Sequence, residues 1–396
     1  MLKIVLLGDT HLGYHAQGRE QDPFQNALNA TELIKQEAPD LILLMGDIFD
    51  LRLPRQETYS EAIIFFKKLE ECLTNKPIKI LKSTKNKATT KKIISIYGTH
   101  EKRNTELNPI TLMDQAGFLT NLHAEGILLK IENEKIGIFG LSGVPENYFV
   151  DILKKWNPAP FENEFNILLL HQSFKEYIPE EDIASISDMP KGFDYIFNGH
   201  IHWHDIKNNF ILTGSLVLTQ LKKIEEKQKG FIVLELEGKK SNFRFVPVNT
   251  RKLYNIQIQV DNKTPTNIFK EIIETGNKKL IEQVTEDNRP PILNFRLIGI
   301  FRSGYSQIDL NTKKIKEEFQ NKAIINFNFS KTEKEDLSYK FSFENIKSKT
   351  LSIQDLTIKI LLSLMEIKDE QFISKLFNCL KEGELEEAKK VILEHA

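Results

Sequence analysis

Short apolar runs of strand length alternate with helix-like stretches through the first 250 residues of this chain of 396 residues. The runs consist mostly of aliphatic and aromatic residues, and charged or turn-forming side chains follow each of them, as they follow buried strands. The expected strands are Lys3–Leu7, Leu41–Met45, Ile93–Tyr97, Ile136–Leu141, Asn166–Leu170, Tyr195–Asn198, Phe210–Thr213 and Phe231–Leu236. This alternation predicts a layered α/β or α+β domain for residues 1–250.

The hydrophobic pattern changes after Arg251. An alternating run at Tyr254–Val260, a helical stretch near Ile268–Ile273 and an apolar run at Ile292–Ile298 follow, and the pattern ends near Phe329. These residues predict a second, small α+β domain over residues 251–335.

The last part of the chain predicts helices. After a charged segment, Lys331–Lys349, a capping residue, Ser352, precedes apolar residues at helical spacing: Leu356, Ile360, Leu361 and Leu364. Further helices are expected over Asp369–Leu380 and Leu385–Leu393. Residues 350–396 are therefore predicted to form a helical module, whose apolar faces either pack on their own domain or dock on a partner protein.

The composition is that of a globular protein, with 40% hydrophobic and 28% charged residues. No apolar run approaches the ~20 residues that a membrane span needs, and the run from Met1 to Gly8 is too short for a signal peptide, so we expect no membrane association. Cys72 and Cys379 are the only cysteines and lie far apart in sequence. Their spacing predicts no disulfide framework and favours a reducing, intracellular compartment.

The total charge gives no argument for nucleic acid, because 54 basic residues are balanced by 55 acidic ones. One segment, Lys76–Lys92, is rich in lysine and poor in acid. It is interpreted either as a solvated loop or the mouth of a strand, or as a contact to DNA phosphates. An argument for DNA therefore has to come from the candidate site.

Candidate catalytic residues come directly after several of the expected strands, whose carboxyl ends commonly meet at one ligand-binding crevice. Five motifs stand at such ends: Asp9-Thr10-His11, Gly46-Asp47, Gly98-Thr99-His100-Glu101, His171 and Gly199-His200-Ile201-His202. Each motif alone is common in turns and cores. Together, in this order, they predict one site on loops at one edge of the sheets.

The residue types of these motifs indicate a pair of metal ions. Mixed histidine and carboxylate ligands suit manganese, iron or zinc, whereas magnesium and calcium prefer oxygen ligands alone. Asp9 and His11 are alternate residues of an extended segment and can serve a single ion, and the two oxygens of Asp47 can bridge two ions. Two ions roughly 3.5–4 Å apart activate a water and clamp a phosphoryl group.

The motifs D-x-H, G-D, G-N-H-D/E, H and G-H-x-H resemble the pattern of the calcineurin-like metallophosphoesterases. Leu12-Gly13-Tyr14, Arg19-Glu20 and Phe24 make the chain more similar to the meiotic-recombination-eleven/SbcD family of DNA double-strand-break repair nucleases, of the archaeal type, than to protein phosphatases. The resemblance covers nearly the whole chain. It implies a two-sheet sandwich flanked by helices for residues 1–250, a DNA-binding cap domain over 251–335 and a partner-docking helical module over 350–396.

The resemblance also implies a role for each site residue. The first ion is held by Asp9, His11 and His202, Asp47 bridges, and the second ion is held by His171 and His200. The remaining motif residues are Thr99, His100 and Glu101. His100 is no ligand in this scheme, but lies over the scissile phosphate and helps to protonate the leaving 3′ oxygen. Glu101 is expected to orient His100.

Thr99 departs from the family pattern, which has an asparagine whose carbonyl oxygen binds the second ion. A threonine hydroxyl is a weaker ligand than an amide carbonyl, so the second ion is expected to bind more loosely.

The function that the resemblance implies is a DNA nuclease that requires two divalent ions, with Mn²⁺ as the expected metal. It would act as a 3′-to-5′ exonuclease and single-strand endonuclease in double-strand-break repair. DNA, a coiled-coil ATPase of the SMC-like kind and a second copy in a homodimer are the expected partners, in the cytoplasm or nucleoid.

Two alternatives stay open. The chain is either a different metallophosphoesterase, acting on a nucleotide or phosphoprotein, or a catalytically weakened scaffold that bridges DNA ends. Thr99 keeps the scaffold interpretation open, although a family variant with full activity is the preferred interpretation of this residue.

Overall fold

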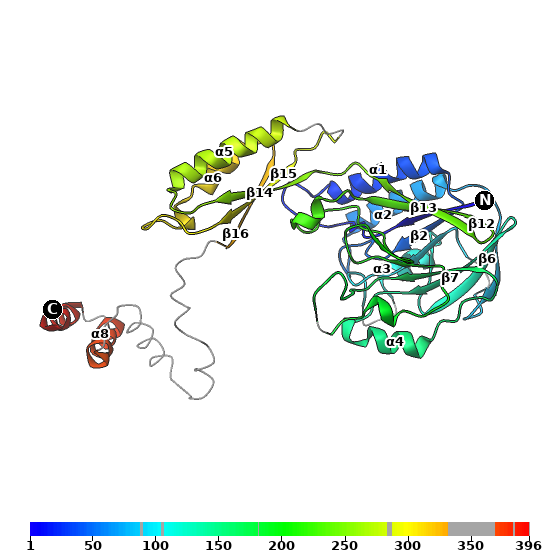
Figure 1. Cartoon of the computed structure of the whole chain (residues 1–396), viewed down its shortest axis with the longest axis horizontal. Helices are drawn as coiled ribbons and strands as arrows, with labels where there is room; N and C mark the ends of the chain where they lie inside the picture. The colour runs from blue at the N-terminus through cyan, green and yellow to red at the C-terminus, as the bar shows by residue number, and fades with distance from the viewer. Residues whose placement is uncertain are drawn as a thin grey trace. The chain divides into compact units, whose positions relative to one another are not determined.

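All eight strands expected in the first 250 residues are present in the computed structural model, which describes residues 1–87, 90–103, 107–180, 182–282, 287–331, 369–382 and 385–395 (Figure 1). The fold is the expected mixed α/β arrangement with two large sheets.

The first sheet has six strands in the order β13-β12-β1-β2-β4-β5. Their bounds are Lys240–Pro247 (β13), Gly230–Glu237 (β12), Leu2–Leu7 (β1), Leu41–Met45 (β2), Ile93–Ile96 (β4) and Thr120–Asn121 (β5). The strands β1, β2 and β4 run parallel, with Leu6 opposite Leu43 and Leu44 opposite Ser95. The loops after these three strands therefore leave the sheet at one edge.

The second sheet has seven strands in the order β10-β11-β9-β8-β7-β6-β3. Their bounds are Asp205–Lys207 (β10), Phe210–Leu212 (β11), Tyr195–Asn198 (β9), Phe165–Leu170 (β8), Glu134–Leu141 (β7), Glu125–Ile131 (β6) and Ile78–Ser83 (β3). The strands β7, β8 and β9 are parallel, so that the loops after β8 and β9 also share one edge.

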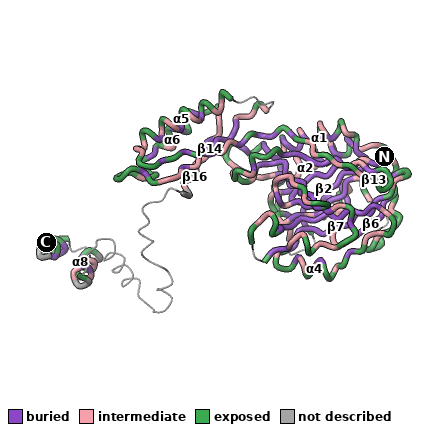
Figure 2. Tube along the Cα trace, viewed as in Figure 1, coloured by how far each residue is buried: buried purple, intermediate pink, exposed green. Residues whose placement is uncertain are grey.

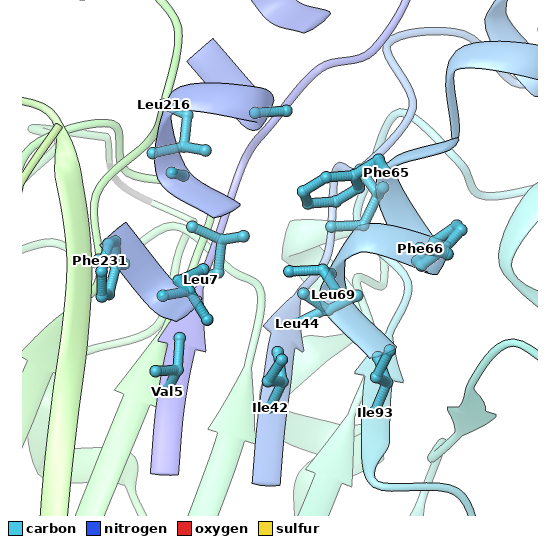
Figure 3. Close-up of a cluster of buried hydrophobic side chains, with 14 of the residues drawn as sticks. Val5, Leu7, Ile42, Leu44, Phe65, Phe66, Leu69, Ile93, Leu216 and Phe231 are labelled. Carbon is cyan, nitrogen blue, oxygen red and sulfur yellow. The ribbon is translucent and has the colours of Figure 1, made fainter. Parts of the chain in front are cut away.

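Alternation along β1 and β2 explains the layers. Val5 on β1 and Ile42 on β2 point to the helical side of the first sheet, in the same buried cluster as Phe65 and Phe66 of α2 (Figure 3). Their neighbours in sequence, such as Ile4, point to the opposite face and join the core between the two sheets. Both faces of the first sheet are thus buried, as its continuous apolar strands require (Figure 2).

Helices cover the outer faces of the sandwich. The helices α1 (Asp22–Glu37) and α2 (Gln56–Cys72) cover the first sheet, and α4 (Phe149–Trp156) packs on the second through Phe149 and Leu153. Helix α3 (Pro109–Gln115) and the short 3-10 helices η1 (Glu146–Tyr148), η2 (Ile186–Asp188) and η3 (Lys223–Glu226) lie in connections.

A third, three-stranded sheet follows, in the order β14-β15-β16. It comprises β14 (Leu253–Gln259), β15 (Ile292–Ile298) and β16 (Ile324–Lys331), with helices α5 (Pro265–Ile281) and α6 (Thr312–Glu318) and the 3-10 helix η4 (Gln307–Asp309). Gly276 lets α5 pack closely against Phe319, because a Cβ at this position would lie 2.4 Å from the Phe319 ring.

The chain divides into two compact units. One comprises Met1–Gln257, Ile272–Arg296 and Thr312–Asn328, and the other Ile258–Glu271, Leu297–Asn311 and the described part of Phe329–Ala396. The boundaries 1–250, 251–335 and 350–396 that the sequence predicts stay a prediction.

Two C-terminal helices, α8 (Glu370–Glu382) and α9 (Leu385–His395), coincide with the two helices expected there. They pack on each other through the buried residues Cys379, Ala388 and Val391. The charged segment 332–349 and the helix expected from Ser352 lie outside the described residues. In the part of the chain that is described, no helix is both long and apolar enough to cross a membrane.

The lysine-rich segment Lys76–Lys92 contacts its own domain. Lys76 pairs with Asp40, and the ammonium groups of Lys85 and Lys87 donate to backbone carbonyl oxygens at 2.8 and 3.0 Å. These lysines stabilise neighbouring loops, and their contact to DNA phosphates stays a prediction.

Candidate metal centre

The five motifs meet at one edge of the sandwich, each on the loop after a parallel strand. Backbone hydrogen bonds link the loops: Asp9 donates to Gly46 at 3.1 Å, and His11 donates to the carbonyl oxygen of Asp47 at 3.0 Å. The amide of His200 donates to the Asp9 carboxylate at 3.0 Å, joining the first sheet to the second. The site is therefore part of the core that holds the two sheets together.

Asp9, His11 and His202 form the first group, with one ligand atom from each lying within 4.8 Å of the others. The Nε2 atoms of His11 and His202 lie 3.2 Å apart. The Nδ1–H group of His11 donates a hydrogen bond to the carboxylate of Asp50 at 3.0 Å. His202 Nδ1 contacts the Thr219 hydroxyl at 2.9 Å. With protons on both Nδ1 atoms, two Nε2 lone pairs face each other, an unfavourable arrangement that a shared cation relieves.

Asp47, His171 and His200 form the second group within the same 4.8 Å limit. His171 donates a hydrogen bond from Nδ1 to the carbonyl oxygen of Met45 at 2.7 Å, so the neutral ring has its lone pair on Nε2. That Nε2 atom is buried, lies 3.0 Å from Asp47 Oδ2 and has no hydrogen bond of acceptable geometry. A buried nitrogen with a free lone pair beside a carboxylate fits a metal ligand.

Asp47 of the second group contacts the segment that carries Thr99 and His100. Asp47 Oδ1 accepts a hydrogen bond from the amide of His100 at 2.9 Å, and the Thr99 hydroxyl lies 3.4 Å from Asp47 Oδ2. The hydroxyl of Thr99 is thus next to the second group, at the position where the family pattern has an amide.

Burial shifts the pKa values of the acidic and imidazole side chains of the site. It raises the pKa of Asp9 well above its ordinary value. Burial also disfavours ionised Asp47 and protonated His171, yet their mutual attraction prevails: it lowers the pKa of Asp47 and raises the pKa of His171 to about 10. Burial lowers the pKa of His200 to about 4, so that its imidazole is neutral. Asp47 and protonated His171 therefore form a buried pair of opposite charge, and a divalent cation held by the same side chains would replace the proton on His171.

Four of the ligand residues have left-handed backbones, although none is a glycine. Their φ angles are 50° for Asp9, 46° for His11, 47° for Asp47 and 69° for His200. Each such residue is strained by roughly 1 kcal/mol or more, and residues of this kind cluster at functional sites. Gly98 is required for another reason, because a Cβ there would lie 2.1 Å from Asp47 Oδ1.

His100 lies at the rim of the site, with 45% of its side chain exposed. Its Nδ1 donates to the backbone carbonyl oxygen of Asp50 at 2.8 Å and lies 3.5 Å from the Asp50 carboxylate. Asp50, His11 and His100 also form a third possible ligand group. We did not predict Asp50 from the sequence, although an aspartate three residues after Asp47 on the same loop was a usable signal.

Glu101 does not orient His100, contrary to our expectation. Its carboxylate is buried and accepts hydrogen bonds from three backbone amides, those of Asp47 at 3.1 Å, Phe49 at 2.9 Å and Gly98 at 2.8 Å. Burial and the charge of Asp47 raise the pKa of Glu101 to about 8. Glu101 therefore fixes the loops after β2 and β4 to each other, while Asp50 orients the His100 ring.

Other supporting residues gave no signal in the sequence. Lys229 is buried, donates to the carbonyl oxygen of His202 at 2.7 Å and pairs with buried Glu225. Glu146 lies 3.8 Å from His200 Nε2 and accepts hydrogen bonds from Gln172 and Ser173. These residues stabilise the loops that carry His200 and His202.

The profile of the calcineurin-like phosphoesterases matches residues 2–204, slightly more than half of the chain. The chain belongs to the calcineurin-like phosphoesterase family. Members of the family act on phosphoesters with divalent metal ions, and the two ligand groups described above fit such ions.

Three relatives share most of the chain's length, and each is named DNA double-strand break repair protein Mre11. The protein of Sulfolobus acidocaldarius is 25% identical over 95% of this chain and 97% of its own. Those of Sulfurisphaera tokodaii and Saccharolobus solfataricus are each 26% identical, over 70% and 76% of this chain and 71% and 76% of their own.

Proposed function

We propose that this phosphoesterase is a manganese-dependent DNA nuclease of double-strand-break repair, with 3′-to-5′ exonuclease and single-strand endonuclease activity. The names of its relatives support this assignment, because the similarity to the Sulfolobus acidocaldarius protein extends over nearly both whole chains. The similarity therefore includes the residues after 250, which lie outside the phosphoesterase domain.

The observation that carries the proposal is the pair of three-residue groups, Asp9 with His11 and His202, and Asp47 with His171 and His200. Each group contains one carboxylate and two imidazoles, a ligand set that suits manganese better than magnesium. The asparagine position of the family holds Thr99, 3.4 Å from Asp47.

Two bound ions would supply an activated water and neutralise the charge of the phosphodiester. The chain's own residues complete the reaction. The Nδ1–H group of His100 donates a hydrogen bond to the backbone carbonyl oxygen of Asp50. His100 can therefore donate to a phosphate oxygen or to the leaving 3′ oxygen only through Nε2, and only when Nε2 is protonated. Asp50 holds the ring in this orientation through its carbonyl oxygen, and Glu101 holds the loop that carries it.

The remaining assignments concern partners. We propose that residues 251–335 bind DNA, that the module 350–396 docks on a coiled-coil ATPase of the SMC-like kind, and that two copies form a homodimer. On α8 and α9, the described leucines Leu380, Leu385 and Leu393 are 53%, 62% and 78% exposed, which suits a docking role. The expected place of action is the cytoplasm or nucleoid, where the DNA is.

A nuclease assay tests the proposal. Labelled single-stranded and double-stranded DNA are incubated with the full chain and Mn²⁺, Mg²⁺ or a chelator, with His100→Ala as the control. Manganese-dependent shortening from 3′ ends and cutting of single strands are expected. DNA binding without cleavage in any metal would indicate a scaffold, and turnover of a phosphoprotein or nucleotide in place of DNA would indicate a different phosphoesterase.

A further inference from the structure

A hollow of about 610 Å³ opens beside His100 and is lined by Asp50, Leu51, Arg52, Leu53, Thr99 and His100. Two of these side chains are leucines in contact with water: Leu51 is 50% and Leu53 69% exposed. A single exposed leucine is common on protein surfaces and needs no explanation. Two leucines on the wall that also holds the proposed catalytic histidine form an apolar surface next to the reacting group.

The leucines are presented from a fixed base. The amide of Phe49 donates to Glu101 at 2.9 Å, and the amide of Asp50 donates to the carbonyl oxygen of Leu12 at 3.0 Å. The Asp50 carbonyl oxygen binds His100, and Leu51 is the next residue. The position of the apolar wall is therefore tied to that of the His100 ring.

Positive charge flanks the same wall. Arg52 is exposed between the two leucines, and Lys102 follows His100 on the neighbouring loop. Arg52 lines the hollow, and its charge adds to partial burial in lowering the pKa of Lys102. Among the described residues neither forms an ion pair, and two adjacent cations of this kind are complementary to an anion.

We propose that this wall is a nucleobase contact: Leu51 and Leu53 pack on an unpaired base next to the scissile phosphodiester, while Arg52 and Lys102 bind the adjoining phosphate. The inference rests on the proposed nuclease function and adds a preference to it. Leucine side chains are known to insert beside bases and separate them from their stack. A base inside a duplex offers neither face, so the contact favours single strands and frayed ends.

The test removes the base and the leucines separately. Single-stranded oligonucleotides carry either normal nucleotides or one abasic residue on either side of the cleaved bond, and kcat/KM is measured with Mn²⁺. Wild type is expected to be about ten-fold slower on the better-placed abasic oligonucleotide. The double variant Leu51→Asn/Leu53→Asn should be about ten-fold slower on normal DNA and show no further loss on the abasic one, because both changes remove one contact.

Leu81→Asn is the matched control, since Leu81 is also an exposed leucine, 38% accessible on β3, and should behave as wild type. Arg52→Gln should lower the salt dependence of single-strand binding by about one unit of slope, measured by anisotropy in chelator. Equal loss for the leucine variant on normal and abasic DNA, or no loss on either, would overturn the inference.

Different results would reject the nuclease function and the nucleobase contact. If wild type hydrolyses bis(p-nitrophenyl) phosphate with Mn²⁺ but cuts no DNA, the nuclease assignment itself is rejected. If wild type cuts normal and abasic DNA at equal rates, only the nucleobase contact is rejected.

Discussion

The backbone carbonyl oxygen of Asp50 lies 2.8 Å from Nδ1 of His100. A carbonyl oxygen only accepts, so this contact places a proton on Nδ1 and leaves Nε2 as the ring nitrogen available for the proposed role of His100. Because Asp50 Oδ1 also binds His11 Nδ1, a single residue positions one ligand and the proposed acid. The two roles are separable by mutation.

His100→Ala should abolish DNA cleavage and leave the manganese content nearly unchanged, because a group that acts in the transition state can be lost without emptying the metal site. Metal content is measured on the purified protein by elemental analysis, beside nuclease rates. Loss of both ions would show that His100 is a ligand.

Asp50→Asn keeps the carbonyl contact to His100 and weakens the hydrogen bond to His11. We therefore expect the first ion to bind more weakly, by the ~10- to 100-fold typical of residues that orient metal ligands. A manganese titration by calorimetry measures this affinity. An unchanged manganese affinity would show that the Asp50 side chain does not position His11 as a ligand and acts on His100 alone.

Glu101→Ala should destabilise the protein strongly, because it leaves three buried amides without their acceptor. Unpaired buried donors cost about 1–3 kcal/mol each, so a loss of at least about 3 kcal/mol in the free energy of unfolding is expected. Glu101→Gln, which keeps the shape and one good acceptor, is the matched control and should lose less. Both are compared by chemical denaturation in chelator, and equal stability of all three proteins would remove Glu101 from the loop contact.

Thr99→Asn restores the residue of the family pattern and should tighten the second ion, by ~10- to 100-fold if the hydroxyl is the weaker ligand. Calorimetric manganese titrations of both proteins, with nuclease rates alongside, measure the difference. Equal second-ion affinities would mean that Thr99, or a water that it holds, already completes the site.

His123 should make stability depend on pH. Burial, and next the charge of Lys85, lower its pKa to about 4 from about 6.5 in the unfolded chain, so the folded state binds fewer protons. Its contribution is complete above pH 6.5 and is lost as pH falls toward 4. Replacing it by phenylalanine, which keeps the stacking on Tyr97, should reduce the acid-side loss by about 2 kcal/mol. Denaturation in chelator at pH 7 and at pH 4.5 gives the comparison, and parallel curves for both proteins would refute it.

Most strands could be predicted from the sequence because they are buried on both faces. Ile42, Leu44 and their neighbours on β2 form an unbroken apolar run, which no other element of that length explains. Strands β3, β5, β6, β10 and β13 are not among the expected strands. In β3, the exposed lysines Lys79 and Lys82 at the edge of the second sheet hide the apolar alternation. Propensity and pattern carry little information at such an edge, where one side of the strand has no neighbour.

The sequence identifies the residues that the structure brings together in the two candidate ligand groups, but not the residues that hold them in place. Asp9, His11 and His202 have rare side chains after apolar strands, whereas Lys229 and Glu225 look like ordinary surface residues in the sequence. Glu101 was noticed for its type but assigned to the wrong neighbour. Its hydrogen bonds come from backbone amides, which every residue except proline has, so the sequence does not indicate which amides it will contact.

The hydrogen bond from the amide of His200 to Asp9 joins positions 191 residues apart. Ribosomes add residues at roughly 5–20 per second, so Asp9 waits on the order of ten seconds or more for its partner. During that time a growing chain has only part of the proposed ligand set, so the proposed nuclease activity would be absent near the ribosome. A chain released before His202 would have the same defect, so on this proposal only chains that contain both groups would be active.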